Sequence, residues 1–299
     1  MMFECVIVGG GPAGLNAALV LGRARRNVVL FDHNSPRNAV TRESHGFITR
    51  EGIEPTEFRE IAHQDIAKYP SVTIRNEKIT DVEKKGILFE LVTKAGECIL
   101  AKKVILATGL KEIHPSVNNI MDYYGKSLFN CPYCDGWELK DRPLIVISEL
   151  PSAYHMVKIV YNWSKDLIVC TNGHKVLTSE QKEVLQRKGI KVFEQNIKTL
   201  VGENGFLEAV IFEGGEVVQR EGGFVTPEWI QASPFGKSLG CEINQLGGII
   251  TDAFGRTNIE GVYAAGDTSV IAPSQVIIAA AEGSRAAIGV NTDLTQEDF

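Results

Sequence analysis

The chain has 299 residues, about the length of two average domains. Hydrophobic residues make up 44% of it and charged residues 23%, which is typical of a globular protein with a sizeable core. The formal net charge of −6 and the lack of any Lys/Arg-rich run argue against nucleic acid as the main partner. No stretch of about 18 uncharged apolar residues occurs, so we expect no membrane partner.

The first residues already have strand character, and no charged leader or cleavage pattern precedes them, so we expect a cytoplasmic protein. In that reducing compartment six cysteines do not predict a framework of structural disulfides. Only Cys131 and Cys134 form a close pair. The other four stand alone among apolar neighbours, and we expect small buried side chains at Cys5, Cys98, Cys170 and Cys241.

A strand, a glycine-rich turn and a helix open the chain. Residues 3–8 form a short apolar run that predicts a buried parallel strand, and a good helical stretch over residues 15–21 ends near three arginines. A second strand over residues 28–31 ends in Asp32, 18 positions after the last glycine of the turn. The turn itself contains Gly9, Gly11, Pro12, Ala13 and Gly14.

Each part of this unit has a physical role in binding a dinucleotide. Gly9 permits the tight turn, Gly11 lets the backbone approach a pyrophosphate, and Gly14 lets the helix pack against the strand. The helix N-terminus supplies N–H groups and a positive dipole, and the carboxylate of Asp32 can accept hydrogen bonds from a ribose. A glycine-rich structural turn is the alternative, but the full strand–turn–helix–strand–acid order favours a dinucleotide site.

The far end of the chain predicts a second group of ligand-binding residues. Residues 261–267 read as a buried strand that runs into a corner at Gly266 and Asp267. Ser274, Gln275 and Val276 then open a helix of small residues, so an acid and a helix N-terminus would face a phosphate-bearing ligand. A third strand-to-turn element ends in Thr108 and Gly109. Asp267 could instead cap a turn, and we expect the acidic tail after Asn291 to fray.

Together with the cysteine pair, these motifs resemble low-molecular-weight thioredoxin reductase, a class II pyridine nucleotide-disulfide oxidoreductase, over nearly the whole chain. The resemblance implies an α/β fold with two Rossmann-like dinucleotide-binding domains. The FAD domain would be discontinuous, over residues 1–112 and 225–299, and the smaller domain would be inserted over residues 113–224. The resemblance also implies FAD as cofactor, a homodimer, and domains that rotate relative to each other.

The resemblance assigns further residues to the flavin. Asp267 would meet the ribityl–phosphate region, and the helix start at Ser274 and Gln275 would face the flavin ring. Asn38 is a further candidate for contact with the cofactor. His45 falls about where the reductases place an asparagine near the flavin, although a loop histidine with a structural role is the alternative.

The cysteine pair is the candidate catalytic centre. A Cys-x-x-Cys pair can close a small disulfide ring, and a thiolate at a helix start is a good nucleophile. Half a zinc site is the rival interpretation, but no second pair of ligands follows at a compatible spacing, so we expect no metal. By the resemblance, Cys134 meets the flavin, Cys131 exchanges with the outside thiol or disulfide, and Asp135 handles a proton. Asp135 with Gly136 could also be a plain turn.

The second dinucleotide motif departs from the resembled family. In the stretch 144–153 the three small positions read Ser148, Leu150 and Ala153. Leu150 stands where the backbone should approach a pyrophosphate, and the charge of Glu149 would repel one. The turn after the next strand, residues 171–174, lacks the paired arginines that the NADPH users of the family have there. NADPH binding is therefore doubtful.

We therefore expect an FAD-dependent thiol–disulfide oxidoreductase without standard NADPH use. It could reduce a thioredoxin-like protein or a small disulfide with electrons from another donor such as ferredoxin. It could also run in reverse, as a dithiol oxidase that passes electrons to oxygen. Residues 36–38 and 44–47 resemble the oxidases, whereas Asp135 resembles the reductases, so the direction stays open. A non-catalytic flavin redox sensor and a flavoprotein similar to NADH dehydrogenase are the remaining alternatives.

Overall fold

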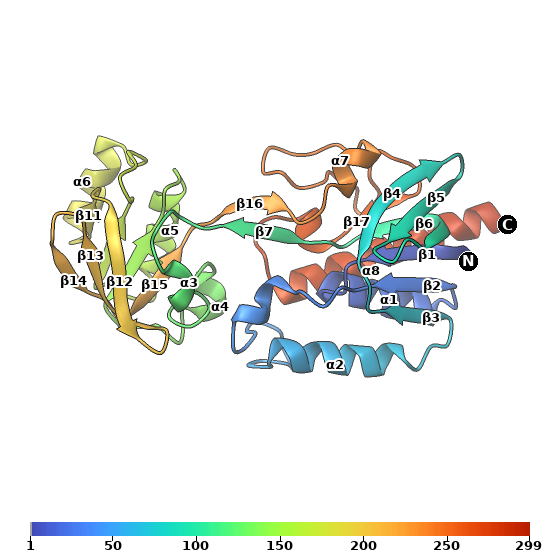
Figure 1. The fold of residues 1–299 in the computed structure, drawn as a ribbon, viewed down its shortest axis with the longest axis horizontal. Coiled ribbons are helices and arrows are strands. Elements are labelled where there is room, and N and C mark those ends of the chain that lie inside the picture. The colour runs from blue at the N-terminus through green and yellow to red at the C-terminus, as the bar shows by residue number, and fades with distance from the viewer. Residues whose placement is uncertain (1) are drawn as a thin grey trace. The chain divides into compact units, whose positions relative to one another are not determined.

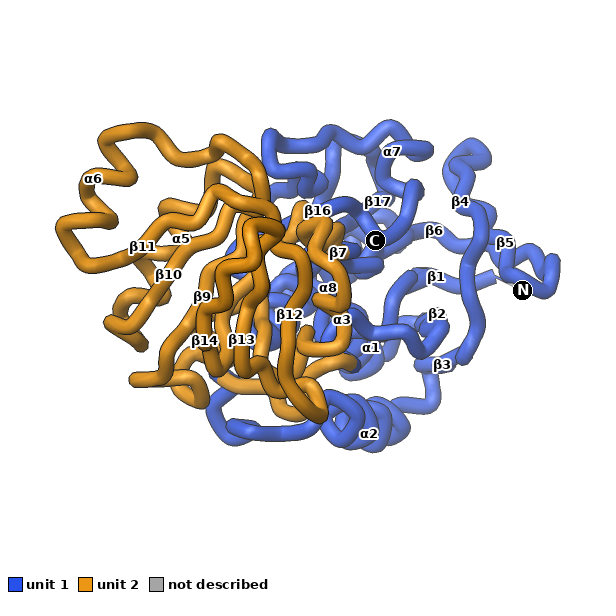
Figure 2. The backbone as a smooth tube through the Cα atoms, turned by 60° about the vertical axis from the view of Figure 1, so that its left-hand side comes forward, with its two compact units in different colours: residues 1–39, 46–111, 229–299 blue, residues 40–45, 112–228 orange. Residues whose placement is uncertain are grey.

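The computed structural model describes residues 2–299, which form two compact units (Figures 1 and 2). The first unit contains the residues up to Ala39, Gly46–Lys111 and Trp229–Phe299, and the second contains Val40–His45 and Glu112–Glu228. The sequence analysis places residues 40–45 in the FAD domain, whereas they cluster with the second unit. The chain passes between the units in β7 (Leu110–Ile113) and β16 (Glu228–Gln231), which pair with each other.

The first unit is built on a seven-stranded sheet in the order β3-β2-β1-β6-β5-β4, with β17 also paired to β6. Strands β1, β2, β3, β6 and β17 run parallel, and β4 and β5 form an antiparallel extension. The strands are β1 (Met2–Val8), β2 (Val28–Phe31), β3 (Val72–Arg75), β4 (Ile79–Lys85), β5 (Leu88–Thr93), β6 (Cys98–Leu106) and β17 (Val262–Ala264).

The register of this sheet brings four strand ends together. Val8 pairs with Phe31 on one side and with Leu106 on the other, and Leu106 also pairs with Ala264. Because the four strands are parallel, the segments that follow them leave the same edge of the sheet. The glycine-rich turn, Asp32, the Thr108 turn and the Gly266–Asp267 corner therefore share one edge.

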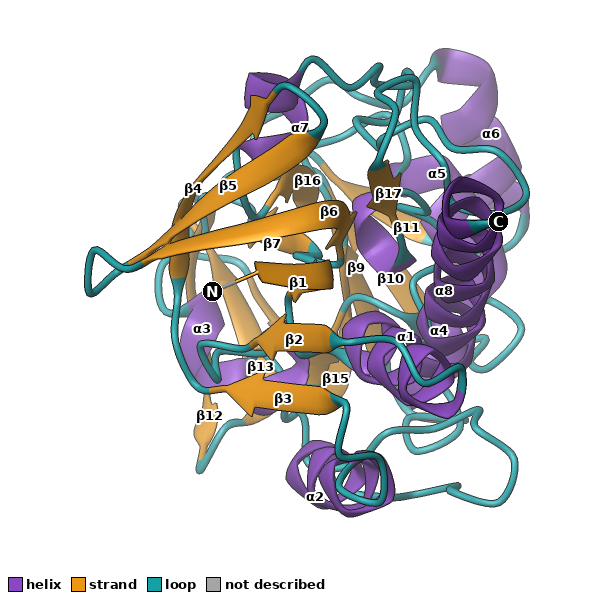
Figure 3. Cartoon of the chain, turned by 90° about the vertical axis from the view of Figure 1, so that its right-hand side faces the viewer, coloured by secondary structure: helices purple, strands orange, loops and turns teal. Residues whose placement is uncertain are grey.

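Two helices cover one face of the sheet and lie side by side in Figure 3, α1 (Pro12–Arg23) and α8 (Val276–Asp298). They approach closely because a Cβ on Gly283 would lie 2.0 Å from the carbonyl oxygen of Ala13. The other helical elements of this unit are α2 (Pro55–Ile66), α7 (Phe235–Leu239) and the short 3-10 turns η1 (Arg37–Val40), whose last residue belongs to the second unit, and η2 (Gly266–Thr268).

The C-terminal tail is helical to Asp298, so the prediction that it frays after Asn291 is wrong. Leu294 is fully buried in the core between α1 and the sheet. Arg26 donates to the side chains of Asn291 and Asp298, at 2.8 and 2.9 Å. Burial and long-range hydrogen bonds therefore order the residues after Asn291, although their acidic composition alone predicts a frayed terminus.

The second unit has a five-stranded parallel sheet in the order β11-β10-β9-β15-β8 and a three-stranded antiparallel sheet, β12-β13-β14. Its strands are β8 (Leu128–Phe129), β9 (Leu144–Ile147), β10 (Leu167–Cys170), β11 (Lys191–Phe193), β12 (Ile197–Glu203), β13 (Phe206–Phe212), β14 (Val217–Gln219) and β15 (Gly222–Val225). Its helices are α3 (Ile120–Tyr123), α4 (Pro132–Asp135), α5 (Ala153–Val160) and α6 (Ser179–Arg187).

Three of the four solitary cysteines are buried as expected, but Cys98 is exposed. It is the first residue of β6, where burial alternates along the strand and Ile99, not Cys98, faces the core. Among residues 2–299, no helix is long and apolar enough to cross a membrane.

Candidate active site

The glycine-rich turn between β1 and α1 is packed tightly on one side and open on the other. Gly9 has a φ of +116°, and a Cβ there would lie 2.1 Å from the carbonyl oxygen of Ala107. A Cβ on Gly14 would lie 1.8 Å from the carbonyl oxygen of Gly9. A Cβ on Gly11, by contrast, would meet nothing within 4 Å. Gly11 thus leaves room for a ligand at the start of α1.

The first turn of α1 offers its backbone N–H groups to this open space. Pro12 occupies the first helical position, and Gly11 caps the helix without any side-chain hydrogen bond. The leading N–H groups of a helix have no partner within the helix, and they carry a partial positive charge. The turn therefore fits a pyrophosphate, as its sequence predicts.

Asp32 lies buried at the end of β2, next to the turn. A Cβ on Gly10 would lie 2.3 Å from its carboxyl carbon, so only glycine fits between them. The carboxylate accepts a hydrogen bond from the backbone N–H of Asn34 at 2.9 Å and forms an ion pair with Arg59 of α2. The pair with Arg59, which the sequence analysis missed, fixes the position of the acid while other lone pairs stay available for a ribose.

The Gly266–Asp267 corner packs directly against the start of α1. Gly266 has a φ of +68°, and a Cβ there would lie 2.8 Å from the Cβ of Ala13. The neighbouring Thr108 turn is tied to the corner, because the N–H of Gly109 donates to the hydroxyl of Thr268 at 2.8 Å. The structure therefore brings these sequence-predicted residues together in the first unit.

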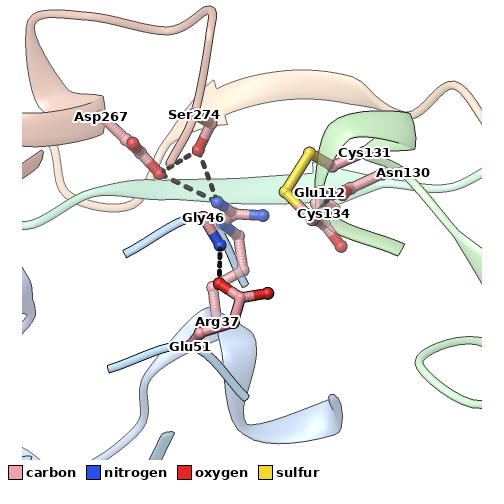
Figure 4. Close-up of a disulfide and its surroundings, with 9 residues drawn as sticks. All are labelled: Arg37, Gly46, Glu51, Glu112, Asn130, Cys131, Cys134, Asp267 and Ser274. Carbon is pink, nitrogen blue, oxygen red and sulfur yellow. Dashed lines mark hydrogen bonds and ion pairs between the residues drawn. A yellow bond between two sulfur atoms is a disulfide. The ribbon is translucent and has the colours of Figure 1, made fainter. Parts of the chain in front are cut away.

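Arg37 anchors Asp267 (Figure 4). The sequence predicts no such contact, since residues 36–38 show only a resemblance to the oxidases. Arg37 of η1 donates to the carboxylate of Asp267 at 2.9 Å and to the hydroxyl of Ser274 at 2.7 Å. Ser274 in turn donates to Asp267 at 2.7 Å, and the guanidinium of Arg37 lies 4.9 Å from the ring centre of Trp229. Asn38 belongs to the same short turn.

The start of α8 completes this edge of the first unit. Gln275 caps the helix without a side-chain hydrogen bond, and Val276 is its first residue. The side-chain nitrogen of Gln275 lies 3.7 Å from the position that a Cβ on Gly46 would take. Two helix starts, a buried acid and an open glycine thus line one sheet edge. This donor set fits FAD, whose flavin accepts and donates electron pairs when it is bound.

Cys131 and Cys134 form a disulfide in the second unit, with Cα atoms 5.3 Å apart (Figure 4). Cys131 directly precedes α4, and its carbonyl accepts the N–H groups of Cys134 and Asp135, both at 3.1 Å. The side chain of the preceding Asn130 donates to the carboxylate of Glu112 at 2.5 Å. Neighbouring backbone and side chains therefore hold the disulfide loop in place.

Asp135 directly follows the second cysteine of the disulfide. Loss of solvent raises the pKa of its carboxyl to about 7, His45 opposes that rise, and Glu138 adds to it. The imidazole Nε2 of His45 lies 3.6 Å from Glu43 and 3.9 Å from Glu138. His45, a sequence-predicted candidate for contact with the flavin, therefore belongs to the unit of the disulfide.

The loop after β9 in the second unit is filled by its own side chains. The carboxylate of Glu149 accepts hydrogen bonds from the N–H of Ser116 at 2.9 Å and from the side chain of Asn172 at 2.6 Å. The N–H of Leu150 donates to the hydroxyl of Ser148 at 3.2 Å. This loop and the disulfide loop leave the same edge of the parallel sheet, after β9 and β8.

The fold and the disulfide define a flavoprotein with two dinucleotide-binding domains and a redox-active cysteine pair. The sequence profile of the pyridine nucleotide-disulphide oxidoreductase family matches residues 3–283, so the chain belongs to that family. A crystal structure described as a putative thioredoxin reductase TrxB from Bacillus anthracis is 49% identical. The match covers 99% of this chain and 100% of that one, with a TM-score of 0.96.

Curated relatives agree with this assignment. The thioredoxin reductase sirT of Leptosphaeria maculans is 29% identical over 97% of this chain and 94% of its own length. A probable thioredoxin reductase of Arthroderma benhamiae is 36% identical over 57% of this chain, and the match spans only 44% of that protein. The chain is thus a thioredoxin reductase-like flavin disulfide oxidoreductase.

Proposed function

We propose that Cys131 and Cys134 exchange electrons between FAD and the dithiol or disulfide of a substrate, and that the second unit does not take NADPH. The observation that carries this proposal is the loop after β9. Its side chains use the space and the hydrogen-bond donors that a pyrophosphate would need, whereas the disulfide loop at the same sheet edge keeps both sulfurs and the acid.

The carboxylate of Glu149 acts as an internal anion in this loop. It takes the backbone N–H of Ser116 and the amide of Asn172, so these donors are engaged by the chain itself. A phosphate that approached would have to displace this carboxylate or lie beside it, and either step is unfavourable. Leu150 adds an isobutyl group where the resembled enzymes have glycine, which keeps the backbone away from a ligand.

The turn after β10 supports the same conclusion. Asn172 has a φ of +47° there, and its side-chain oxygen accepts the N–H of Ile197 at 2.9 Å. His174 turns its Nδ1 to the carbonyl oxygen of Asn172 at 2.9 Å. The turn is therefore organised by its own hydrogen bonds, and residues 171–174 include no guanidinium that could pair with the 2′-phosphate of NADPH.

The cysteine pair then carries the chemistry. A substrate thiolate attacks the sulfur of Cys131, the Cys131–Cys134 bond breaks, and Cys134 leaves as a thiolate. The second substrate thiol displaces Cys131, which releases the substrate as a disulfide and leaves both enzyme cysteines reduced. Two protons pass from the substrate thiols to the protein, and we assign the transfer of one of them to the carboxyl of Asp135, which directly follows Cys134. In the reductive direction the same exchanges run backwards.

We expect the substrate to be a thioredoxin-like protein, because the relatives named above are thioredoxin reductases, and a small-molecule dithiol is the alternative. A homodimer and a cytoplasmic location are expected on the same basis. Without NADPH, the electron pair reaches FAD from another donor such as ferredoxin, or from the substrate dithiol itself. In the second case oxygen takes the electron pair, and the protein is a dithiol oxidase.

The test follows the flavin absorbance of the holoprotein without oxygen. We expect NADPH and NADH to leave the absorbance near 450 nm unchanged, and dithiothreitol to bleach it. Rapid bleaching by a nicotinamide nucleotide would overturn the proposed loss of that cofactor. No bleaching by any dithiol would favour a flavoprotein that senses or binds without turnover. Admission of oxygen after bleaching separates an oxidase, which recovers its colour and forms peroxide, from a reductase that needs another partner.

A further inference from the structure

The disulfide loop begins where the chain leaves the parallel sheet of the second unit. The pairing between β8 and β15 ends at Phe129, and α4 begins at Pro132. Asn130 lies between these two elements and is joined by a peptide bond to Cys131. Because the strand pairing stops at Phe129, the residue that leads into the disulfide depends on other contacts for a fixed place.

A buried carboxylate supplies such a contact. Glu112 has a side chain that is 8% exposed, and it accepts a hydrogen bond from the side-chain nitrogen of Asn130 at 2.5 Å (Figure 4). A carboxylate removed from water favours such a donor strongly, because an unsatisfied charge in a dry place is costly. The Nε2 of His114 lies 3.4 Å from the same carboxylate, and its ring packs edge-on against Tyr124. Glu112 is thus held in place beside His114 and bound to the disulfide loop.

The two ends of the disulfide loop are anchored on different segments of the second unit. Glu112 lies in β7, which pairs with β16, and 18 positions of the chain separate it from Asn130. At the other end, the ring of Tyr133 lies edge-on to Trp163, with 5.5 Å between the ring centres. A Cβ on Gly136 would lie 2.8 Å from a ring carbon of Trp163, so the chain passes this ring closely. Loss of the contact with Glu112 would leave the loop anchored mainly on Trp163.

We propose that Glu112 is a positioning residue, which acts through Asn130 to keep Cys131 within bonding reach of Cys134 and thereby stabilises the disulfide against reduction. This inference rests on the proposed function. When a substrate dithiol reduces the pair, the bond between the two sulfurs breaks, and an electron pair and two protons pass from the substrate to the protein. The reverse step forms the bond again only when the two sulfurs meet. A loop that is held at both ends loses less conformational freedom on closure than a loop held at one end.

The experiment measures the redox equilibrium of the cysteine pair in the FAD-loaded protein. Wild type and variants are equilibrated without oxygen in mixtures of reduced and oxidised dithiothreitol, quenched with acid and alkylated. Mass spectrometry then counts the free thiols in the peptide that contains Cys131 and Cys134. In Glu112→Ala we expect the equilibrium constant to shift roughly threefold to tenfold toward the dithiol, because the freed segment must be ordered again each time the bond closes.

Matched variants separate the hydrogen bond from other effects of the substitution. Asn130→Ala removes the other partner, so it should shift the equilibrium as far as Glu112→Ala does, and the double variant should shift it no further. Glu112→Gln keeps an acceptor for Asn130 and should stay within about twofold of wild type. Glu183→Ala, at an exposed carboxylate of α6 in the same unit, should leave the equilibrium unchanged. Circular dichroism and retained FAD identify variants that have not folded, and Asn130→Ala carries the test if Glu112→Ala does not fold.

The possible outcomes are distinguishable. An unchanged equilibrium in the folded variants would overturn the role of Glu112 and leave the proposed function intact. Additive shifts in the double variant would show that the two residues act independently, which also overturns the inference. A shift in Glu112→Gln as large as in Glu112→Ala would assign the effect to charge and would overturn positioning through Asn130. If no dithiol bleaches the flavin of wild type, the proposed function fails. Thiol counting still decides the role of Glu112, because it needs no electron transfer to the flavin.

Discussion

The two units contain the same arrangement of strand, loop and helix, and they use it in opposite ways. In the first unit the loop between β1 and α1 leaves open space at Gly11. In the second, the loop between β9 and α5 carries Leu150 at the corresponding place and binds its own carboxylate, that of Glu149. The sheet beneath each loop is intact. The comparison teaches that the loop of such a unit can change while the strands and helices that carry it keep their arrangement.

The sheet and the loop of the second unit differ in how much they contribute to its stability. All four residues of β9 are fully buried, and they pack against the apolar face of α5 and the neighbouring strands. Burial of such side chains drives folding, whereas the loop at the strand end contributes little to the core. The loop can therefore change its ligand chemistry without loss of the sheet beneath it.

Replacement of Cys134 by serine gives the largest expected effect, because the disulfide loop is the part of the second unit to which we assign catalysis. Without the second sulfur no disulfide forms, so dithiol-driven turnover should fall at least about a thousandfold. FAD should stay bound, since the glycine loop belongs to the first unit. Steady-state rates and the flavin spectrum measure both, and Cys98→Ser, at an exposed thiol, serves as control. Unchanged turnover would favour a flavin sensor.

The substitution Gly11→Leu should give the loop between β1 and α1 the side chain that blocks the loop between β9 and α5. The backbone there has a φ of −78°, which any residue adopts, and a Cβ meets nothing within 4 Å, so the fold should persist. The side chain would cover the start of α1, and we expect FAD to bind roughly tenfold to a hundredfold more weakly. Fluorescence titration of the apoprotein measures this. Gly11→Ala should lose less affinity, and equal loss in both variants would contradict the steric explanation.

The reverse change should open the second loop. In the double variant Glu149→Gly with Leu150→Gly, the internal carboxylate and the blocking side chain are both absent. We expect nicotinamide nucleotides to gain affinity by about tenfold, since one repulsive charge and one steric obstacle are removed. NADH should gain as much as NADPH, because residues 171–174 have no guanidinium for a 2′-phosphate. Calorimetric titration provides the measurement, with Glu183→Gln as the matched loss of charge. An unchanged affinity would mean that another feature keeps the nucleotide out.

Most of the fold and much of the site follow from local sequence patterns. The glycine turn, Asp32 and the Gly266–Asp267 corner are each marked by a strand that ends in a specific residue type, and parallel strands bring such ends to one edge. The start of α6 also follows a local pattern, because Thr178 and Gln181, three residues apart, form a capping box.

Contacts between distant segments could not be predicted in this way. Arg37 and Asp267 form an ion pair across 230 positions of the chain, and Asp32 pairs with Arg59 of α2, which no sequence motif links to it. The position of His45 beside Glu138 depends on a six-residue segment that leaves one unit and joins the other. A single sequence contains no period or motif that marks such pairings, because they arise from packing of whole elements.

The smallest expected effect concerns stability and tests whether the buried carboxyl of Asp135 destabilises the second unit at neutral pH. The pKa of Asp135 is raised from 3.8 to about 7, so the folded protein binds this proton more tightly than the unfolded chain does. Its contribution to the free energy of unfolding is therefore complete below about pH 4 and is lost as the pH rises to about 7. Because the side chain is only partly buried, we expect a loss on the order of 1 kcal/mol.

Asp135→Asn removes this titration and should be more stable relative to wild type at pH 8 than at pH 4 by that amount. Urea unfolding of the oxidised protein at the two pH values gives the difference, in which the other titrating groups cancel. Asp122→Asn, at an exposed aspartate of the same unit, controls for the change in net charge. A constant difference between Asp135→Asn and wild type would mean that the carboxyl is well solvated. Asp135 would then be ionised at neutral pH and could not donate a proton during dithiol exchange.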